Sequence, residues 1–443
     1  MHDHFEEVDE LRGRLIIGGT EVGECLAKVF RNPYRLNEME VELFDPPELR
    51  QNEVPDRFFQ SPESVDSELI YEGPQITRSL KLKTFELAGT NLSSFSKSVS
   101  VEKYRSTEFF GEIDEPERAT VGYLFPLTTV VKSGLRPTKD ARHGLYRGEF
   151  NRETGTADLA PNTFEIETPL GRAEIVELYD SRDVEKRSGY PVTAVVMHSG
   201  LHFKDLDCTS KSLETILEHS RSVVERIMLL FSLIEQNRIT WSREKVNFTS
   251  SDDEWIGRQT TRRWSSPPTD SYYAGYRAKG VTHEAFEVIN NAYWTLSSEE
   301  KKKIDEVLDN FTIAYTRKTI ETGLLYWHSC LDQICQDLYG EDHRVFSKQI
   351  VATCDAAGIK VEDLLEEDVL DYWREDISGE TQNFRFVNTR NTFVHDSLGA
   401  NLEESQKVIE DRRVARALAE RLLLAKIGVD PETVPLGDAR VVP

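Results

Sequence analysis

The sequence has 443 residues, of which 38% are hydrophobic, 9% aromatic and 30% charged. At about 100–200 residues per domain, this length predicts two or three domains, and the composition excludes wholesale disorder. No apolar run approaches the roughly 18 residues that a membrane-spanning helix needs. The acidic first residues lack the apolar segment of a secretory signal, so none is expected. Five scattered cysteines without a C-x-x-C pair argue against a disulfide framework or zinc ribbon, and indicate a reducing, cytoplasmic environment.

The charge is strongly acidic, with 78 Asp and Glu against 54 Lys and Arg, a net charge of −24. Arginine is preferred, with 34 Arg to 20 Lys. Such a surface is typical of a halophilic prokaryotic protein, because at about 1 M salt a Debye length of about 3 Å leaves little self-repulsion. An ordinary acidic mesophilic protein is the alternative. The acidic net charge argues against nonspecific binding to duplex nucleic acid but allows a locally basic nucleic-acid site.

The N-terminal part, residues 1–205, is predicted to be a β-rich domain. Short alternating or apolar runs recur from about residue 10, among them Leu15–Ile17, Thr120–Phe125 and Thr193–Met197, and turn-forming residues separate them. Because no helical periods intervene, we expect a sandwich or barrel-like arrangement rather than a βαβ fold. The fold class expected for the whole chain is therefore α+β.

Residues 206–282 are predicted to hold a helix, a strand and a linker. Apolar residues recur at helical spacing from Leu213 to Gln236, and a strand-like segment, 238–242, follows. Residues 249–282 are rich in Ser, Pro, Asp and Gly, and we expect an irregular linker or functional loop there.

Residues 283–428 are predicted to form an up-and-down bundle of four or five helices. Ser297 and Glu300 make a capping box before one helix. A second carries apolar residues spaced 4-3-4-3-4 from Ile320 to Leu338, with Gly340 as its C-cap. Further helices are expected at about 384–397 and 403–427. Residues 429–443 are expected to form a mobile tail.

The segment that carries the most specific chemistry is R-N-x-x-x-H, formed by Arg390, Asn391 and His395. On a helix, Asn391 and His395 share a face and Arg390 lies beside it. Histidine moves protons near neutral pH, and arginine presents a fork of donors to a phosphoryl group. Asparagine can hold the imidazole or orient the arginine. This set of side chains suits phosphate chemistry.

The motif, its preceding amphipathic helix and the long helix after it resemble the HEPN superfamily, whose signature is an R-x4-H type motif late in a helical bundle. A β-rich region followed by such a bundle is similar to the ApeA-type HEPN proteins of prokaryotic antiviral defence. The resemblance covers roughly residues 297–428, and the N-terminal half matches in layout only.

The resemblance implies a metal-independent endoribonuclease that acts as a homodimer through the C-terminal bundle. His395 would transfer protons while the ribose 2′-OH attacks the adjacent phosphate, Arg390 would stabilise the phosphorane, and Asn391 would hold the geometry. Asp332 matches an acidic residue that reaches the arginine in the family, and His328, one turn earlier, can belong to the same cluster. The resemblance also implies abortive-infection defence with a phage-derived trigger on the N-terminal domain.

Other interpretations are open from the sequence. Arg390 can form a structural ion pair with Asp332, with His395 closing a helix end. The bundle is then a non-catalytic interaction or nucleotide-binding module that serves as a dimerisation platform or regulator. A phosphate-binding enzyme of another kind is a third possibility, although no cofactor motif supports it.

A second candidate site interleaves aromatic and basic residues between 255 and 279. Aromatic rings stack on unpaired bases while arginines contact phosphates, so this pattern predicts a site for single-stranded RNA. The alternative is that the aromatics pack the segment onto a domain. The candidate RNA-binding residues are Trp255, Arg258, Arg262, Arg263, Trp264, Tyr276, Arg277 and, on the last helix, Arg413.

No metal site, cofactor or membrane partner is predicted. His198 and His202 are spaced as H-x-x-x-H, but they lie on a predicted strand and turn and lack the glutamate of the zinc-protease pattern.

Overall fold

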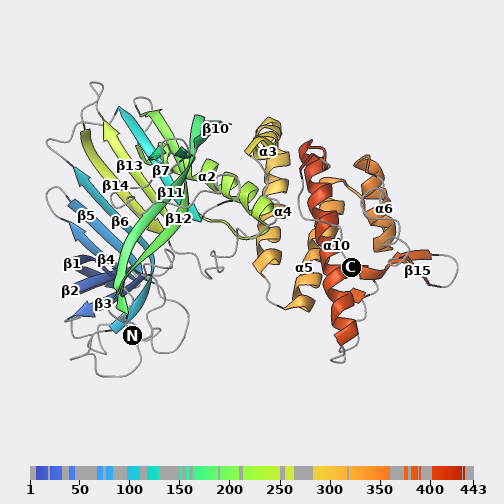
Figure 1. Ribbon diagram of the computed structural model, residues 1–443, viewed down its shortest axis with the longest axis horizontal. Helices are drawn as coiled ribbons and strands as arrows, with labels where there is room; N and C mark the ends of the chain where they lie inside the picture. The colour runs from blue at the N-terminus through green and yellow to red at the C-terminus, as the bar shows by residue number, and fades with distance from the viewer. Residues whose placement is uncertain are drawn as a thin grey trace.

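The structure is a computed structural model, shown in Figure 1. It describes residues 6–17, 20–31, 39–44, 67–72, 76–82, 97–109, 117–126, 128, 149–151, 156–158, 163–187, 190–208, 213–249, 255–263, 283–316, 319–359, 374–377, 381–387, 389–390, 402–431 and 433–434.

Among these residues, twelve strands form one antiparallel sheet in the order β10-β11-β12-β7-β13-β14-β6-β3-β2-β1-β4-β5. The bounds of these strands are β1 Glu6–Ile17, β2 Thr20–Arg31, β3 Met39–Phe44, β4 Ser67–Glu72, β5 Ile76–Leu82, β6 Lys97–Phe109, β7 Arg118–Pro126, β10 Thr163–Thr168, β11 Gly171–Arg187, β12 Tyr190–Asp207, β13 Arg243–Thr249 and β14 Trp255–Arg263. Two small hairpins lie apart from it: β8 Glu149–Asn151 with β9 Thr156–Asp158, and β15 Arg374–Ile377 with β16 Thr381–Phe384.

The large sheet branches at β6. β6 pairs with β3 through Lys97 to Ser100 and with β14 through Lys103 to Phe109. It also pairs with β5, which closes a ring of pairings through β1, β2, β3, β6, β5 and β4. The strands from β14 to β10 continue the sheet away from this ring.

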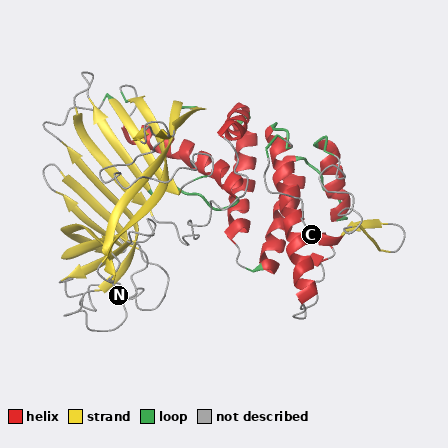
Figure 2. Ribbon diagram, in the orientation of Figure 1, coloured by secondary structure: helices red, strands yellow, loops and turns green. Residues whose placement is uncertain are grey.

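Helices make up most of the described residues in the C-terminal half, and Figure 2 shows strands and helices gathered in two parts of the molecule. Their bounds are α2 Leu213–Glu235, α3 His283–Thr295, α4 Ser298–Thr316, α5 Ile320–Gln333, α6 Phe346–Ala356 and α10 Leu402–Ile427; a π-helical turn, η2 Ile334–Leu338, continues α5. The mixed α+β class predicted from the sequence is therefore confirmed.

One hydrophobic core runs from the sheet into the helices, and α2 carries it between them. The inward face of β7 follows from its alternation, since Val121, Tyr123 and Phe125 are buried at every second position. Phe231 of α2 packs on Phe125 and stacks on Phe286 of α3, with ring centroids 4.3 Å apart in the second pair. The helical part is thus fixed to the sheet through α2 (Figure 1).

Several helix boundaries agree with the sequence prediction. Ser297 and Glu300 make the predicted capping box, in which the Ser297 main-chain N–H donates to Glu300 at 3.0 Å. Leu324, Trp327, Leu331 and Ile334 are fully buried along the predicted stripe. Gly340 and Gly428 end their helices with φ of 74° and 91°, a conformation that glycine adopts without a steric penalty.

Three local predictions are corrected. The predicted irregular segment contains β14, a strand in the middle of the sheet. The sequence did not indicate this strand, because its buried positions include the polar Gln259 and Thr261, where apolar side chains are expected. Residues 238–242 are not a strand: Ile239 and Trp241 are buried alternately, but the Ile239 N–H donates to the Ser232 hydroxyl of α2 at 2.8 Å. The β15–β16 hairpin interrupts the predicted all-helical region.

Candidate functional site

The R-N-x-x-x-H motif begins on a helix that follows β16 directly. Residues 385–387 and 389–390 are helical, and we call these five residues the motif helix. Its first residue, Arg385, is buried and donates from Nε to Asp411 of α10 at 2.8 Å. Thr389, one turn later, donates its hydroxyl to the other oxygen of Asp411 at 2.6 Å. These contacts fix the motif helix against α10.

His328 on α5 holds the motif helix from a second direction. The ring nitrogen Nε2 lies 3.0 Å from the main-chain oxygen of Phe386, so it donates to that carbonyl. Burial lowers the pKa of His328 to about 4, and the positive charge of Arg390 acts in the same direction, against the carbonyl hydrogen bond. His328 is therefore a neutral hydrogen-bond donor at pH 7, a role the sequence could not distinguish from proton transfer.

Arg390 is exposed and lies close enough to His328 to influence its pKa. The motif helix thus presents a solvent-accessible guanidinium from a segment whose preceding turn is buried. Asn391 and His395 lie outside the described residues, so the structure does not place the other two residues of the motif.

Asp332, the predicted acidic partner of Arg390, is half-buried at the end of α5. It accepts hydrogen bonds from Gln336 Nε2 at 2.8 Å and from Gln349 Nε2 of α6 at 3.1 Å. The contacts seen for Asp332 therefore join α5, its π-helical turn and α6. π-helical turns are frequent at functional sites. This one continues α5, the helix whose His328 contacts the motif helix.

The candidate RNA-binding residues are distributed over two parts of the molecule. Arg258 is exposed on β14, opposite Glu108 of β6. Trp255, Arg262 and Arg263 belong to the same strand, but their side chains are not described, and Trp264, Tyr276 and Arg277 lie outside the described residues. Arg413 is exposed on α10, which α3 and α4 separate from β14 (Figure 1).

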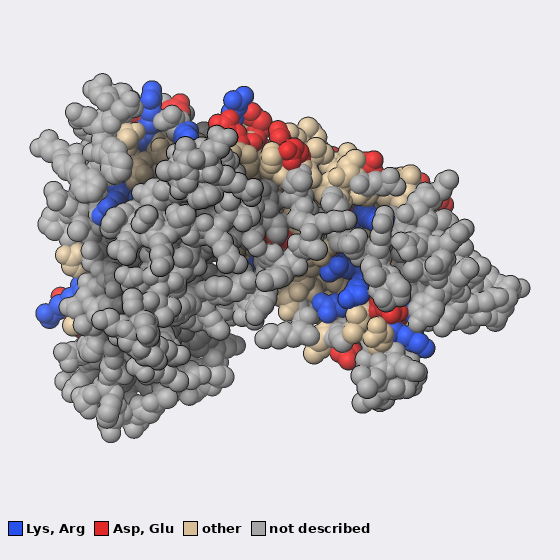
Figure 3. Space-filling model, in the orientation of Figure 1, with Lys and Arg blue, Asp and Glu red and all other residues tan. Residues whose placement is uncertain are grey.

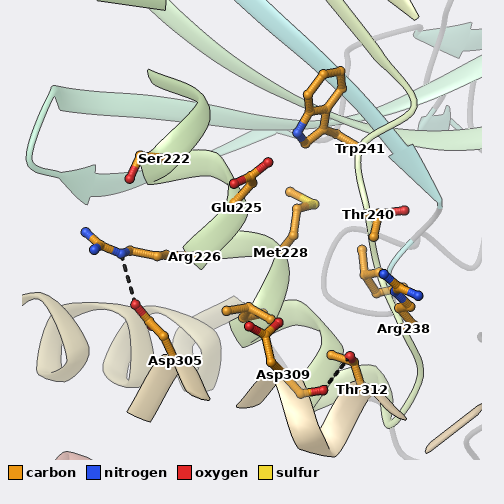
Figure 4. Close-up of a pocket in the computed structure, with 12 residues that line it drawn as sticks. Ser222, Glu225, Arg226, Met228, Arg238, Thr240, Trp241, Asp305, Asp309 and Thr312 are labelled. Atoms are coloured by element: carbon orange, nitrogen blue, oxygen red, sulfur yellow. Dashed lines mark hydrogen bonds and ion pairs between the residues drawn. The ribbon is translucent and has the colours of Figure 1, made fainter. Parts of the chain in front are cut away.

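A separate pocket of about 330 Å³ lies between α2, α4 and the segment 238–241 (Figure 4). Two charged residues of its lining form an ion pair: Arg226 donates to Asp305 at 3.1 Å. The Tyr293 hydroxyl of α3 donates to the same carboxylate at 2.5 Å. Burial raises the pKa of Asp305 and of Asp309, which also lines the pocket. These pairs join α2 to α3 and α4 within the core.

The described residues contain no cluster of three or more His, Cys, Asp or Glu side chains arranged for a metal ion. Within the same residues, no helix is both long and apolar enough to span a bilayer. No family model, curated protein or solved structure matches this chain.

The buried anchor of the motif helix was not predicted from the sequence. Asp411 occupies a position on the apolar stripe of α10, where its neighbours at helical spacing are Val408, Ala415 and Leu418. A single carboxylate on such a stripe is a detectable signal, because a buried charge requires a partner. Arg385, five residues before the motif arginine, is that partner.

Proposed function

We propose that the chain is a metal-independent endoribonuclease that cleaves single-stranded RNA at a site built on Arg390, Asn391 and His395. The observation that carries this proposal is the position of Arg390, exposed on a helix that Asp411 and His328 hold rigidly. A guanidinium on a fixed frame is suited to a phosphate whose charge grows in the transition state.

In the proposed reaction, the ribose 2′-oxygen forms a bond to the adjacent phosphorus and the bond from phosphorus to the 5′-oxygen breaks. His395 takes part in the proton transfers from the 2′-hydroxyl and to the 5′-oxygen. Arg390 stabilises the phosphorane, and Asn391 holds the geometry. The products carry a 2′,3′-cyclic phosphate and a 5′-hydroxyl.

The wider arrangement belongs to the same proposal. The helical part acts as a HEPN-like bundle that dimerises and brings two motifs together. The β-rich N-terminal part, with a barrel-like or sandwich arrangement, recognises a phage-derived trigger and controls cleavage in the cytoplasm during antiviral defence. The hydrophobic core that α2 carries from the sheet to the helices supports this coupling, because its buried side chains form one continuous cluster across the two parts.

The test is cleavage of end-labelled single-stranded RNA in EDTA, with salt scanned from low to molar concentration. His395→Ala and Arg390→Ala are compared with wild type, and Lys302→Gln, which removes an exposed cation of α4, is the matched control. We expect wild type and Lys302→Gln to produce 2′,3′-cyclic phosphate ends and both motif variants to lose at least about a hundredfold in rate.

Equal cleavage by wild type and His395→Ala would contradict the proposal. Absence of cleavage by wild type, both in vitro and in phage-infected cells, together with a stable dimer, would favour the non-catalytic module instead.

A further inference from the structure

Two arginines of α10, Arg412 and Arg416, lie one turn apart and have few anionic partners among the described residues. Arg412 is half-buried, and among the described residues no carboxylate lies within ion-pair distance of it. Arg416 lies 3.8 Å from Glu420, and its buried Nε has no hydrogen-bond acceptor within the described part of the chain. A partly buried guanidinium usually has such partners, which makes these two arginines candidates for binding an anion.

Glu420 does not neutralise the pair closely. Its Oε1 accepts from the Tyr315 hydroxyl at 2.7 Å and its Oε2 from Gln236 at 3.0 Å. Both distances are shorter than the contact with Arg416. The carboxylate oxygens therefore lie closer to Tyr315 and Gln236 than to Arg416.

Gly323 makes room for the Arg412 guanidinium. A Cβ at Gly323 would lie 2.6 Å from Nε and 2.7 Å from Cζ of Arg412, so any other residue would displace that group. Gly323 belongs to the first turn of α5, whose main-chain dipole adds positive potential. Burial, and then the charge of Arg416, lowers the pKa of Arg412. We call the three residues Arg412, Arg416 and Gly323 together the arginine notch.

The arginine notch is adjacent to the motif helix. The hydrogen bond between Thr389 and Asp411 joins the two helices, and Arg390 and Arg412 are the next residues on each. Figure 3 shows lysine and arginine side chains gathered on the surface over the region of α5 and α10. These basic side chains contrast with the net charge of −24 for the whole chain.

We propose that the arginine notch binds a backbone phosphate of single-stranded RNA that flanks the phosphate contacted by Arg390. This inference rests on the proposed function for the identity of the ligand. A planar guanidinium matches the oxygens of a phosphate, and a second guanidinium one helical turn away shares its charge. RNA is favoured over a free phosphate because Arg412 lies against Gly323 of α5 and Arg390 acts on His328 of the same helix, so the two arginines can contact neighbouring phosphates of one strand.

The test measures affinity separately from cleavage, with a labelled RNA strand in which 2′-O-methyl groups remove the nucleophile but keep every phosphate. Three variants are compared with wild type across a salt series. Arg412→Gln removes the charge, Gly323→Ala keeps all charges but displaces the guanidinium, and Lys302→Gln is a control with the same loss of charge on α4. Thermal unfolding confirms that each variant is folded.

We expect Arg412→Gln to weaken RNA binding about tenfold or more and to reduce the logarithmic salt dependence by about 0.7, the value for one phosphate contact on a single strand. Gly323→Ala should weaken binding in the same direction, and Lys302→Gln should bind as wild type does. Equal affinities for Arg412→Gln and Lys302→Gln would overturn the proposal. Unchanged affinity for Gly323→Ala would overturn the notch as the binding geometry.

Inorganic phosphate, added as a competitor at constant ionic strength, distinguishes the source of the ligand. Phosphate binding that Arg412→Gln abolishes, together with unchanged RNA affinity in that variant, would mean a free phosphate and would overturn the RNA assignment. Binding that depends on Arg412 without any cleavage of unmodified RNA would refute the ribonuclease and retain the notch. Cleavage of unmodified RNA, together with an affinity that does not depend on Arg412, would retain the ribonuclease and refute the notch.

Discussion

Arg385 and Asp411 form a buried ion pair that ties the motif helix to α10. Nε and Nη2 of Arg385 both contact Oδ1 of Asp411, at 2.8 and 2.7 Å. Asp411 is fully buried, and burial raises its pKa while Arg385 and the Thr389 hydroxyl oppose that shift. Arg390 is exposed one and a half turns further along the chain, so the start of the motif helix is held in the core while its motif arginine is accessible to solvent.

Replacing Asp411 by asparagine leaves the Arg385 charge buried without its main counter-charge. Loss of one partner from a buried pair costs about 3–5 kcal/mol, so we expect the free energy of unfolding to fall by about 3 kcal/mol or more. Urea denaturation measures this change. Glu410→Gln, next to it on α10, removes a weaker and more exposed contact of 3.3 Å and should cost less than about 1 kcal/mol. Equal losses in the two variants would contradict the central role of Asp411.

The stability of the protein should depend on pH through His328. Its pKa is about 4 in the folded protein, against 6.5 for an exposed histidine. Below pH 6.5, His328 is protonated in the unfolded chain but stays neutral in the folded chain. The contribution of His328 to the free energy of unfolding is therefore complete above about pH 6.5 and is lost as the pH falls toward 4. Each pH unit in this window costs about 1.4 kcal/mol.

His328→Gln isolates that contribution, because glutamine can donate to the Phe386 carbonyl but does not titrate. Between pH 6.5 and pH 5, wild type should lose about 2 kcal/mol more of its free energy of unfolding than the variant does. Urea denaturation at the two pH values provides the comparison, in which all other titrating groups cancel. Parallel losses in wild type and variant would show that His328 is not the group responsible.

Removing the charge of Arg390 should raise the pKa of His328, because that charge opposes protonation of the imidazole. Arg390→Gln is expected to shift the His328 titration upward, measured by NMR of the ring protons, without lowering the unfolding temperature, since Arg390 is exposed. Arg413→Gln, which removes an exposed arginine of α10, is the control and should leave the titration unchanged. An unaltered His328 titration in Arg390→Gln would place Arg390 too far away to share a site with it.

The elements that could be predicted well from the sequence are those in which local chemistry and burial agree. The helix from Ser298 has its capping box and its apolar face, and α5 has a continuous apolar stripe that ends at Gly340. The strand β14 was missed because its inward positions include Gln259 and Thr261, which hide the alternation. Residues 255–263 form a strand because they pair with β6, which is distant in the sequence, and a local sequence pattern does not reveal such pairing.

The site was predictable to the same limited extent. The sequence identified the motif residues from their chemistry, and the helical start at Arg385 agrees with the expected helix at 384–397. It proposed Asp332 as a partner of Arg390, whereas the contacts seen for Asp332 are with Gln336 and Gln349. Which carboxylate meets which arginine depends on how α5, α6 and α10 pack, and that packing is set by many contacts that single residues do not encode.

A second buried network joins α2 to the sheet and offers a test of the coupling between the two parts of the molecule. Glu244 of β13 is fully buried and accepts two hydrogen bonds of 2.6 Å from Arg221 of α2. The Tyr123 hydroxyl of β7 lies 2.7 Å from Ser220 and donates to Glu244 at 3.1 Å, and burial raises the pKa of Tyr123. Two strands and a helix therefore share one carboxylate.

Because these groups form one network, we expect their substitutions to be non-additive. Tyr123→Phe should lower the free energy of unfolding by about 1–2 kcal/mol, since it removes one donor to Glu244 and one contact with Ser220. Glu244→Gln should cost about 3–5 kcal/mol, because Arg221 loses its charged partner. The loss of unfolding free energy in the double variant should be smaller than the sum of the two single losses by at least about 0.5 kcal/mol, the coupling typical of residues in contact. Urea denaturation of the four proteins measures the cycle, and strict additivity would show that Tyr123 and Glu244 act independently in holding α2 on the sheet.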